Sequence, residues 1–346
     1  MNYIGSKLAL LDFIDEVINK EIEKKDNLVF CDIFSGTGVV GKYFKNKGYS
    51  IISNDIQYFS YVLSKVLIEN NGPIVFNALK SQNILDPFKY LNNLKGKKGF
   101  IYKNYSLGGT FNQEFARNYF TDENAMKIDA IRMKIRQWQK QGLLNEKEYF
   151  YLIGSLIESS DKVANTASVY EAFLKKIKSS AMKTIELKPM EITISDANSF
   201  YFSTNEDSNE LINHISGDIL YLDPPYNTRK YDTNYHILET IALYDSPKIK
   251  GKTGVRAEES KKSKFCSKKE AQNALEEIIK KSKFKYIILS YNDEGIIPMD
   301  NIKEMFSKYG EYSCYEKIHR RFKSDNERNY RKDFTIEYLH CLKKKC

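Results

Sequence analysis

Apolar and polar positions along this chain fall into two blocks in which strand-like and helix-like segments alternate. In the first block, short apolar runs at residues 28–34 and 49–53 predict buried strands, and helical spacing at residues 39–46 and 58–69 predicts helices. The second block contains strands at 191–195, 218–222, 284–290, 311–318 and 334–342, and helices at 233–244, 268–282 and 299–308. Repeated β-α-β units that end in two strands predict an α/β fold with a doubly wound, mostly parallel sheet and a terminal antiparallel β-hairpin.

The region between the two blocks, residues 72–190, has a different pattern. It has few β-branched runs, and helical spacing dominates the segments 125–140, 146–162 and 168–178. Residues 100–117 are rich in aromatics and contain a glycine pair, which predicts an irregular loop. We therefore expect one domain built from residues 1–71 and 191–346, interrupted by a mostly helical insertion at residues 72–190.

The sequence Asp223-Pro224-Pro225-Tyr226 directly follows the apolar run 219–222. It places a carboxylate, a backbone carbonyl and an aromatic ring at the carboxyl end of a predicted strand, where ligands of open α/β sheets bind. The prolines have no N–H groups and favour extended backbone, which leaves the Pro224 carbonyl open to a ligand. The same residues also suit an ordinary turn at the end of a strand.

A short glycine turn connects the first predicted strand to the first predicted helix. It contains Asp32, Gly36 and Gly38, and glycines let a ligand lie against bare backbone. The turn lacks the third glycine of a dinucleotide fingerprint and the Lys-Ser/Thr ending of a phosphate-binding loop. Together with Asp55 at the end of the next strand, it is typical of a site for S-adenosylmethionine, in which Asp55 accepts hydrogen bonds from the ribose hydroxyls.

Composition narrows the class of protein further. A hydrophobic share of 42% argues against disorder, and a net charge of +9 suits a polyanionic partner. The five cysteines are scattered and form no C-x-x-C pair, so we expect neither a metal site nor a disulfide framework. Acidic residues interrupt the N-terminal apolar stretch, and no apolar run is long enough to span a bilayer, so we expect a cytoplasmic protein without a membrane segment.

With these motifs in this order, the chain resembles the Dam-like N6-adenine-specific DNA methyltransferases. The N-terminal residues 2–7 look like the leading motif of that family, and residues 226–231, 234–236, 239–240 and 161–166 look like the modification methyltransferases of FokI type. The resemblance covers nearly the whole chain and implies a Rossmann-like sheet, S-adenosylmethionine as cofactor and double-stranded DNA as substrate. It also implies that residues 72–190 recognise the target, and that a cognate restriction endonuclease is a separate partner.

The resemblance assigns roles to individual residues of this chain. It implies catalytic roles for Asp223, Pro224 and Tyr226. It implies cofactor contacts for Tyr3, Lys7, Asp32, Phe34, Gly36, Gly38, Asp55, Asp196 and Asp223.

The chemistry of adenine explains why these catalytic residue types suit the reaction. The amino nitrogen is a poor nucleophile because its lone pair is delocalised into the ring. Asp223 and the Pro224 carbonyl would each accept one N–H and orient the amine, and Tyr226 would stack on the flipped base. Two alternatives stay open, because Tyr226 also suits a core aromatic and Asp196 also suits a helix cap or turn.

Two basic regions and one basic pair are candidate DNA contacts. Segments 248–269 and 320–332 are rich in Lys and Arg, side chains that bind phosphate but also occur on solvated surfaces. The first segment also contains two glycines, and we expect it to be a mobile loop that orders on DNA. A basic pair directly after the catalytic motif is not general to Dam-like enzymes, so we assign it to DNA contact alone. The predicted contacts are Arg229, Lys230, Lys252, Arg256, Arg320 and Arg321.

Two rival functions are consistent with the same fold. The first is a methyltransferase that acts on an amino group of an RNA base, and the second is a non-catalytic DNA-binding specificity subunit. The order of the motifs and the large insertion argue against the first. An intact glycine turn beside an intact Asp-Pro-Pro-Tyr motif argues against the second.

Overall fold

The structure, a computed structural model, describes residues 3–23, 25–195, 198–226, 231–257, 263–320 and 334–345. The chain forms two compact units, each assembled from separate stretches of sequence. Unit 1 contains Met1–Ile4, Lys65–Ile192 and Asp232–Ser260, and unit 2 contains Gly5–Ser64, Thr193–Tyr231 and Lys261–Cys346. Both the N-terminus and the segment after the catalytic motif therefore supply residues to each unit.

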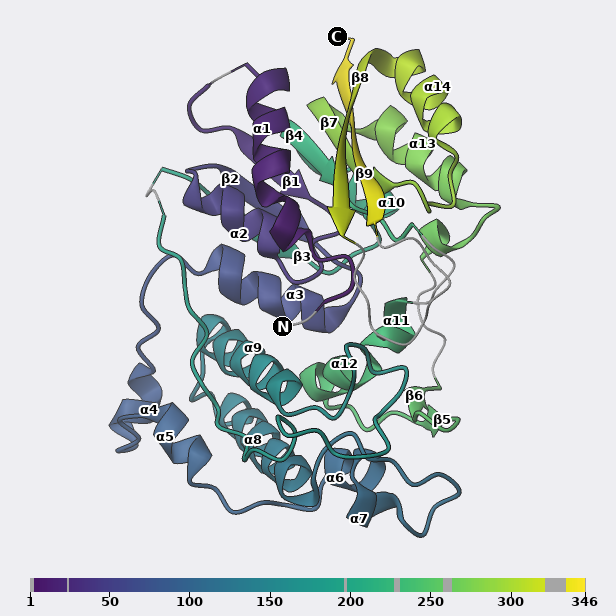
Figure 1. The fold of residues 1–346 in the computed structure, drawn as a ribbon. Helices are drawn as coiled ribbons and strands as arrows, with labels where there is room; N and C mark the ends of the chain where they lie inside the picture. Colours follow the sequence, from purple (N-terminus) through teal and green to yellow (C-terminus); the bar gives the residue numbers. More distant parts are fainter. Residues whose placement is uncertain are drawn as a thin grey trace. The chain divides into compact units, whose positions relative to one another are not determined.

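Unit 2 is built on a seven-stranded sheet within the described residues, with the order β3-β2-β1-β4-β7-β9-β8 (Figure 1). Its strands are β1 (Val29–Asp32), β2 (Ser50–Asn54), β3 (Tyr201–Thr204), β4 (Ser216–Leu222), β7 (Lys283–Asn292), β8 (Gly310–Arg320) and β9 (Phe334–Lys344). Strands β3, β2, β1, β4 and β7 pair in parallel, whereas β9 is antiparallel to both β7 and β8. The strand order reverses between β1 and β4, which is the switch point where open α/β sheets bind ligands.

Helices cover both faces of this sheet. They are η1 (Lys7–Leu10), α1 (Leu11–Glu21), α2 (Val39–Asn46), α3 (Tyr58–Ser64), α10 (Ser208–Leu211), η3 (Lys264–Cys266), α13 (Ala271–Lys281) and α14 (Met299–Tyr309). The amphipathic α13 and α14 pack Leu275 and Phe306 into an apolar core with Leu220 and Ile287 of the sheet. On the opposite face, Phe30 of β1 stacks on a ring of α2. Figure 1 shows α1 and α2 on one side of the sheet and α13 and α14 on the other.

Unit 1 is mainly helical. It contains η2 (a π-helical turn, Lys65–Glu69), α4 (Asn77–Ser81), α5 (Pro87–Asn92), α6 (Phe100–Tyr105), α7 (Leu107–Thr110), α8 (Asp122–Lys140), α9 (Glu146–Lys162) and α12 (His236–Leu243). The short α11 (Tyr231–Asn234) spans the boundary between the units, and β5 (Ile249–Lys250) and β6 (Val255–Arg256) form a small hairpin. The start of α9 is fixed by a capping box, in which Asn145 and Glu148 bond each other's backbone N–H groups.

The structure confirms the predicted fold class: a mostly parallel sheet with an antiparallel C-terminal pair and a helical insertion. The helices α2 and α9 have the bounds that the sequence indicated, and six of the predicted strands differ from the observed ones by one or more residues at their ends. The predicted target-recognition role of residues 72–190 is a question of function, and it stays a prediction.

Four local predictions were wrong. Residues 191–195 form no strand, and β3 begins at Tyr201 instead, because that segment is the one that pairs with Ile51 of β2. Residues 168–178 form turns rather than a helix, because the Asn165 side chain bonds the backbone at both Leu174 and Lys178.

The other two errors concern segments that we expected to be irregular. Residues 100–117 contain the short helices α6 and α7, and residues 248–269 contain the β5–β6 hairpin and η3. Asp129 lies on α8, distant in sequence, and stabilises the start of α6 by accepting hydrogen bonds from the N–H groups of Ile101 and Tyr102. Local sequence does not reveal such a contact.

Candidate active site

A buried lysine lies between two carboxylates in unit 2. Lys7, at the start of η1, places its Nζ 2.9 Å from Asp223 Oδ1 and 3.2 Å from Glu337 Oε1. The side chains of Lys7 and Glu337 are 3% and 5% exposed, and that of Asp223 is 17% exposed. Ser290 of β7 donates a 2.6 Å hydrogen bond to the same Glu337 oxygen. The cluster thus joins the N-terminal segment, the end of β4 and the strands β7 and β9.

The charges in this cluster shift each other's pKa. Burial alone would lower the pKa of Lys7, but Asp223 and Glu337 outweigh it and raise that pKa well above its usual value. Burial raises the pKa of Asp223 to about 6; Lys7 opposes this rise and Glu337 adds to it. Lys7 therefore keeps its positive charge. Asp223, in contrast, changes its protonation state near its pKa of about 6, which is close to neutral pH.

The contacts described for Pro224 and Tyr226 lie within unit 2. Pro224 is buried, and no hydrogen bond to its carbonyl oxygen occurs among the described residues. The Tyr226 carbonyl accepts the Ile296 N–H at 2.9 Å, and its ring meets the Tyr291 ring edge-on at 6.0 Å. Lys7 Nζ lies 5.6 Å from the centre of the Tyr226 ring. The motif is thus anchored at Tyr226, while the Pro224 carbonyl stays available to a ligand.

The glycine turn lies at the carboxyl end of β1. Gly36 and Gly38 have positive φ values of 51° and 74°, which side chains with a Cβ rarely adopt. Asp55 follows β2 and accepts the Gly36 N–H at 2.8 Å through Oδ2. Asp32 ends β1 and accepts the Phe34 N–H at 3.2 Å.

Three aspartates at the ends of neighbouring strands influence one another. Burial raises the pKa of Asp32 well above its usual value, and the negative charges of Asp223 and Asp55 raise it further. Lys7 is the cation that opposes this rise. The structure therefore brings Asp32, Asp55, Asp223 and Lys7 to one edge of the sheet, as the sequence predicted for strand ends.

Tyr3, predicted to contact the cofactor, belongs to unit 1. Its ring stacks on Tyr235 with a centroid distance of 4.6 Å, and the Ile4 N–H donates to Tyr235 Oη at 2.7 Å. Phe34 packs edge-on against Phe265 in unit 2. These contacts hold both aromatic rings in place, and neither tests their predicted role.

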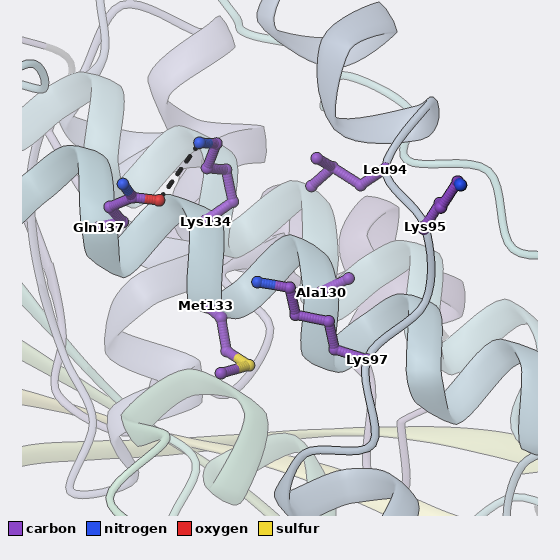
Figure 2. A pocket seen from close by; sticks show the side chains of 7 residues that line it. All are labelled: Leu94, Lys95, Lys97, Ala130, Met133, Lys134 and Gln137. Carbon is purple, nitrogen blue, oxygen red and sulfur yellow. Dashed lines mark hydrogen bonds between the residues drawn. The ribbon is translucent and has the colours of Figure 1, made fainter.

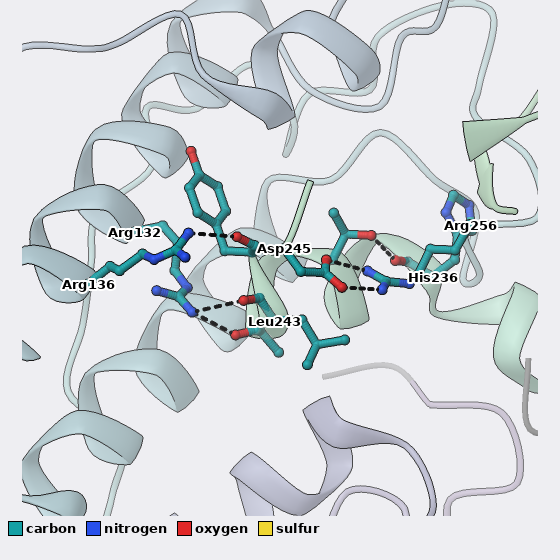
Figure 3. A network of polar contacts seen from close by, with 9 residues as sticks. Arg132, Arg136, His236, Leu243, Asp245 and Arg256 are labelled. Atoms are coloured by element: carbon teal, nitrogen blue, oxygen red, sulfur yellow. Dashed lines mark hydrogen bonds and ion pairs between the residues drawn. The ribbon is translucent and has the colours of Figure 1, made fainter. Parts of the chain in front are cut away.

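The basic residues of the β5–β6 hairpin differ in their surroundings. Lys252 is exposed, whereas both guanidinium nitrogens of Arg256 bond Asp245, at 2.9 and 2.5 Å (Figure 3). The turn between the strands is fixed by buried Arg117, which donates to the carbonyls of Gly251 and Lys252 at 2.9 and 3.1 Å. The hairpin is therefore ordered by unit 1 itself.

Two further arginines bond the end of α12 (Figure 3). Arg132 is 2% exposed and donates to the carbonyls of Ile241 and Ala242 at 2.9 and 2.8 Å. Arg136 donates to the Tyr244 carbonyl at 3.2 Å. Basic side chains near a helix C-terminus stabilise it, so both arginines support the end of α12.

A cavity of about 240 Å³ lies on unit 1, and Figure 2 shows its lining. Lys95, Lys97 and Lys134 contribute amines, and Leu94 and Met133 contribute apolar surface. None of the predicted catalytic or cofactor residues lines it, so we place the candidate active site in unit 2 instead.

The remaining predicted residues have no described side-chain environment. Asp196, Arg229, Lys230 and Arg321 lie outside the described residues, and Arg320 is described only as the last residue of β8. Conversely, sequence analysis missed Glu337. The signal was present: Glu337 is an acidic residue at an inward position of a strand whose neighbours two residues away, Thr335 and Leu339, are also buried.

Two kinds of feature are absent from the described residues. No helix in this part of the chain is long and apolar enough to cross a membrane. No group of three or more His, Cys, Asp or Glu side chains is arranged to hold a metal ion in the described part of the chain.

Known proteins match this chain over most of its length. The family described as D12 class N6 adenine-specific DNA methyltransferase matches residues 3–305. Type II methyltransferase M.NlaIII of Neisseria lactamica is 45% identical over 348 residues, which cover 99% of this chain and 99% of the relative.

Two further relatives differ in length. Type II methyltransferase M.FokI of Planomicrobium okeanokoites is 43% identical over 94% of this chain, which spans 50% of that relative. Type II methyltransferase M.CviAII of Paramecium bursaria Chlorella virus 1 is 35% identical, over 94% of this chain and 93% of the relative. No solved structure matches the chain significantly.

Proposed function

The chain belongs to the D12 class of N6-adenine-specific DNA methyltransferases, and from this premise we propose how its residues perform the reaction. The family makes the chain a site-specific adenine DNA methyltransferase with S-adenosylmethionine as methyl donor. We further propose that it is a type II modification enzyme that protects DNA from a separately encoded restriction endonuclease. The relatives named as type II methyltransferases support this role.

The residues at the carboxyl ends of β1 and β2 fit S-adenosylmethionine. Bound there, the cofactor supplies a methyl group activated by a positively charged sulfur. Asp32, Asp55 and Asp223 form an acidic group in which each charge disfavours the others, so a cationic ligand relieves their repulsion. Gly36 and Gly38 leave the turn without side chains, so that the ligand can approach the backbone.

We keep the other predicted cofactor contacts as proposals. They are Tyr3, Lys7, Phe34 and Asp196. Of these, Lys7 has the clearest support, because its ion pair with Asp223 couples the cofactor region to the catalytic motif.

One observation carries the catalytic proposal: at the end of β4, two consecutive residues each have a hydrogen-bond acceptor with no partner among the described residues. Asp223 Oδ1 bonds Lys7, but neither Asp223 Oδ2 nor the Pro224 carbonyl has a hydrogen-bond partner among the described residues. The adenine amino group has two N–H donors. One donor to each acceptor would fix the nitrogen so that its lone pair points at the methyl group.

The same residues stabilise the charge that develops during transfer. Positive charge builds on the amino nitrogen as the new N–C bond forms, and the Asp223 carboxylate stabilises it. The methylated nitrogen then loses one proton, for which Asp223 is a suitable acceptor. Tyr226 would stack on the adenine once the base has left the duplex, as enzymes that modify bases require.

DNA must reach this site through basic surface. We propose phosphate contacts for Arg229, Lys230, Lys252, Arg256, Arg320 and Arg321. Arg256 is the weakest of them, because Asp245 occupies its guanidinium. We also propose that residues 72–190 recognise the target within a chain whose residues 1–71 and 191–346 form the catalytic domain.

The test is methyl transfer followed by sequencing. Purified protein, labelled S-adenosylmethionine and duplex DNA that lacks adenine methylation are mixed, and single-molecule sequencing locates the modified bases. We expect N6-methyladenine within one short sequence motif, and no product with the Asp223→Ala variant. Label in structured RNA but not in duplex DNA, or no transfer to DNA from any of several genomes, would overturn the proposal.

A further inference from the structure

Two buried carboxylates share a single lysine at the candidate active site. Lys7 Nζ contacts Asp223 at 2.9 Å and Glu337 at 3.2 Å, and all three groups lie in unit 2. If Lys7 served only to neutralise Asp223, Asp223 would be the one carboxylate that it contacts. The second acid gives the three groups a net charge of −1 when Asp223 is ionised.

Stability does not explain Glu337. Its position on β9 lies between Thr335 and Leu339, on the buried face of a strand that pairs with β7. Burying a second carboxylate costs desolvation energy that its contact with a shared lysine offsets only in part. Buried charged groups that contradict the surrounding apolar pattern are typical of functional sites.

The contacts of Glu337 fix where Lys7 points. Ser290 Oγ donates to Glu337 Oε1 at 2.6 Å, and the same oxygen receives Lys7. Ser290 is fully buried on β7, so Glu337 is anchored to the central part of the sheet. Lys7 is thereby held between two carboxylates, so its ammonium group does not lie midway between the two oxygens of Asp223.

We propose that Glu337, anchored by Ser290, is a positioning residue for the methyl transfer: it draws Lys7 toward β9, so that Lys7 occupies only Asp223 Oδ1 and leaves Oδ2 to the adenine amino group. It also keeps the cluster negative, so that the positive charge developing on the amino nitrogen is neutralised. Both effects act on the transition state through Asp223. This inference rests on the proposed function of Asp223.

The electrostatics of Asp223 provide a readout. The charged and titratable groups that interact with Asp223 come from four elements: Lys7 on η1, Asp32 on β1, Glu337 on β9, and Tyr221 and Tyr226 at the end of β4. Glu337 is a negative charge that raises the pKa of Asp223. Removing that charge therefore lowers this pKa and moves the acid limb of the rate profile to lower pH.

The experiment measures single-turnover methyl transfer as a function of pH, on a duplex that carries the target motif with its adenine unmethylated. We expect Glu337→Gln to lower the rate about 10- to 100-fold and to shift the acid limb to lower pH, with the KM for DNA and the Kd for S-adenosylmethionine within about twofold of wild type. Glu316→Gln, an exposed acid on the neighbouring strand β8, serves as the matched control and keeps the wild-type rate.

A second variant covers the case in which Glu337→Gln does not fold. Ser290→Ala removes only the hydroxyl that anchors Glu337, and we expect a smaller loss of rate with an unchanged melting temperature. A wild-type rate in either variant, or a loss in Glu337→Gln with an unmoved acid limb, would overturn the inference. If wild-type protein is active and Asp223→Ala is not, such a result refutes the role of Glu337 alone; an inactive wild type refutes the proposed function.

Discussion

Asp129 in unit 1 and Asp223 in unit 2 are both buried aspartates, but they differ in the donors around them. Asp129 is fully buried and accepts the N–H groups of Ile101 and Tyr102 and the O–H of Tyr244, at 3.0, 2.9 and 2.6 Å. Asp223 receives Lys7 on one oxygen and has no described partner on the other. Neutral protein donors thus satisfy both oxygens of Asp129, whereas Asp223 keeps an acceptor for a substrate.

The direction of a pKa shift does not separate these two acids. Burial raises the pKa of Asp129, although the hydrogen bonds that it accepts lower that pKa in part. Burial also raises the pKa of Asp223. Hydrogen-bond satisfaction is therefore the feature that distinguishes a structural buried acid from a catalytic one in this chain, and each acid should fail in its own way when it is changed.

The largest effect is expected from Asp223→Asn. The amide cannot accept a second N–H with the strength of a carboxylate, so we expect single-turnover methyl transfer to fall by at least about 10²- to 10³-fold. The melting temperature and the affinity for duplex DNA should remain near wild type, because the asparagine oxygen can still accept a bond from Lys7, and Glu337 still pairs with that lysine. Near-normal transfer by this variant would remove the basis of the catalytic proposal.

The matched change in unit 1 should affect stability instead. Asp129→Ala leaves the N–H groups of Ile101 and Tyr102 and the Tyr244 hydroxyl without their acceptor in a buried place. We expect the free energy of unfolding, measured in urea, to fall by about 3 kcal/mol or more. Folded protein should still transfer methyl groups at low temperature, and a full loss of transfer with unchanged stability would contradict the comparison.

Part of the candidate site could be predicted from the sequence, and part could not. Motifs at strand ends located Asp32, Asp55 and Asp223, because parallel strands bring their carboxyl ends to one edge and the β-α-β pattern is local. The N-terminal Lys7 was found through the resemblance to a family. The contact between Lys7 and Glu337 was not predicted, because it joins residues near opposite ends of the chain. No local pattern in the sequence specifies which buried groups meet.

The errors in the fold have the same origin. Residues 168–178 have helical spacing, but side-chain bonds from Asn165 hold them in turns. Residues 191–195 alternate like a strand, yet β2 pairs with the segment that starts at Tyr201. In the first case side-chain hydrogen bonds, and in the second a strand partner distant in sequence, outweigh the local propensity for a helix or a strand.

The pH dependence of transfer also distinguishes the two aspartates. The pKa of Asp223 is raised to about 6, so its carboxyl group is protonated below that pH and loses the charge that stabilises the amino group. We expect the single-turnover rate to fall about tenfold per pH unit below pH 6, and to level off above it. Asp129→Asn should keep the same acid limb, since Asp129 does not take part in the reaction, whereas Asp223→Asn should abolish it.

The smallest effects concern two cations of the β5–β6 hairpin that differ as the two aspartates do. Lys252 is exposed, whereas Arg256 is paired with Asp245 through both guanidinium nitrogens. We expect Lys252→Ala to weaken DNA binding severalfold and to reduce the slope of log affinity against log salt by about 1, because one phosphate contact is lost. Arg256→Ala should change that slope less and lower stability by less than about 1 kcal/mol, because its main partner belongs to the protein. Fluorescence anisotropy with labelled duplex over a range of salt concentrations measures both slopes. An equal reduction of the slope in the two variants would show that the Arg256–Asp245 ion pair opens when DNA binds. In that case, a partner within the protein would not exclude a cation from binding DNA, although it does distinguish the structural from the catalytic aspartate.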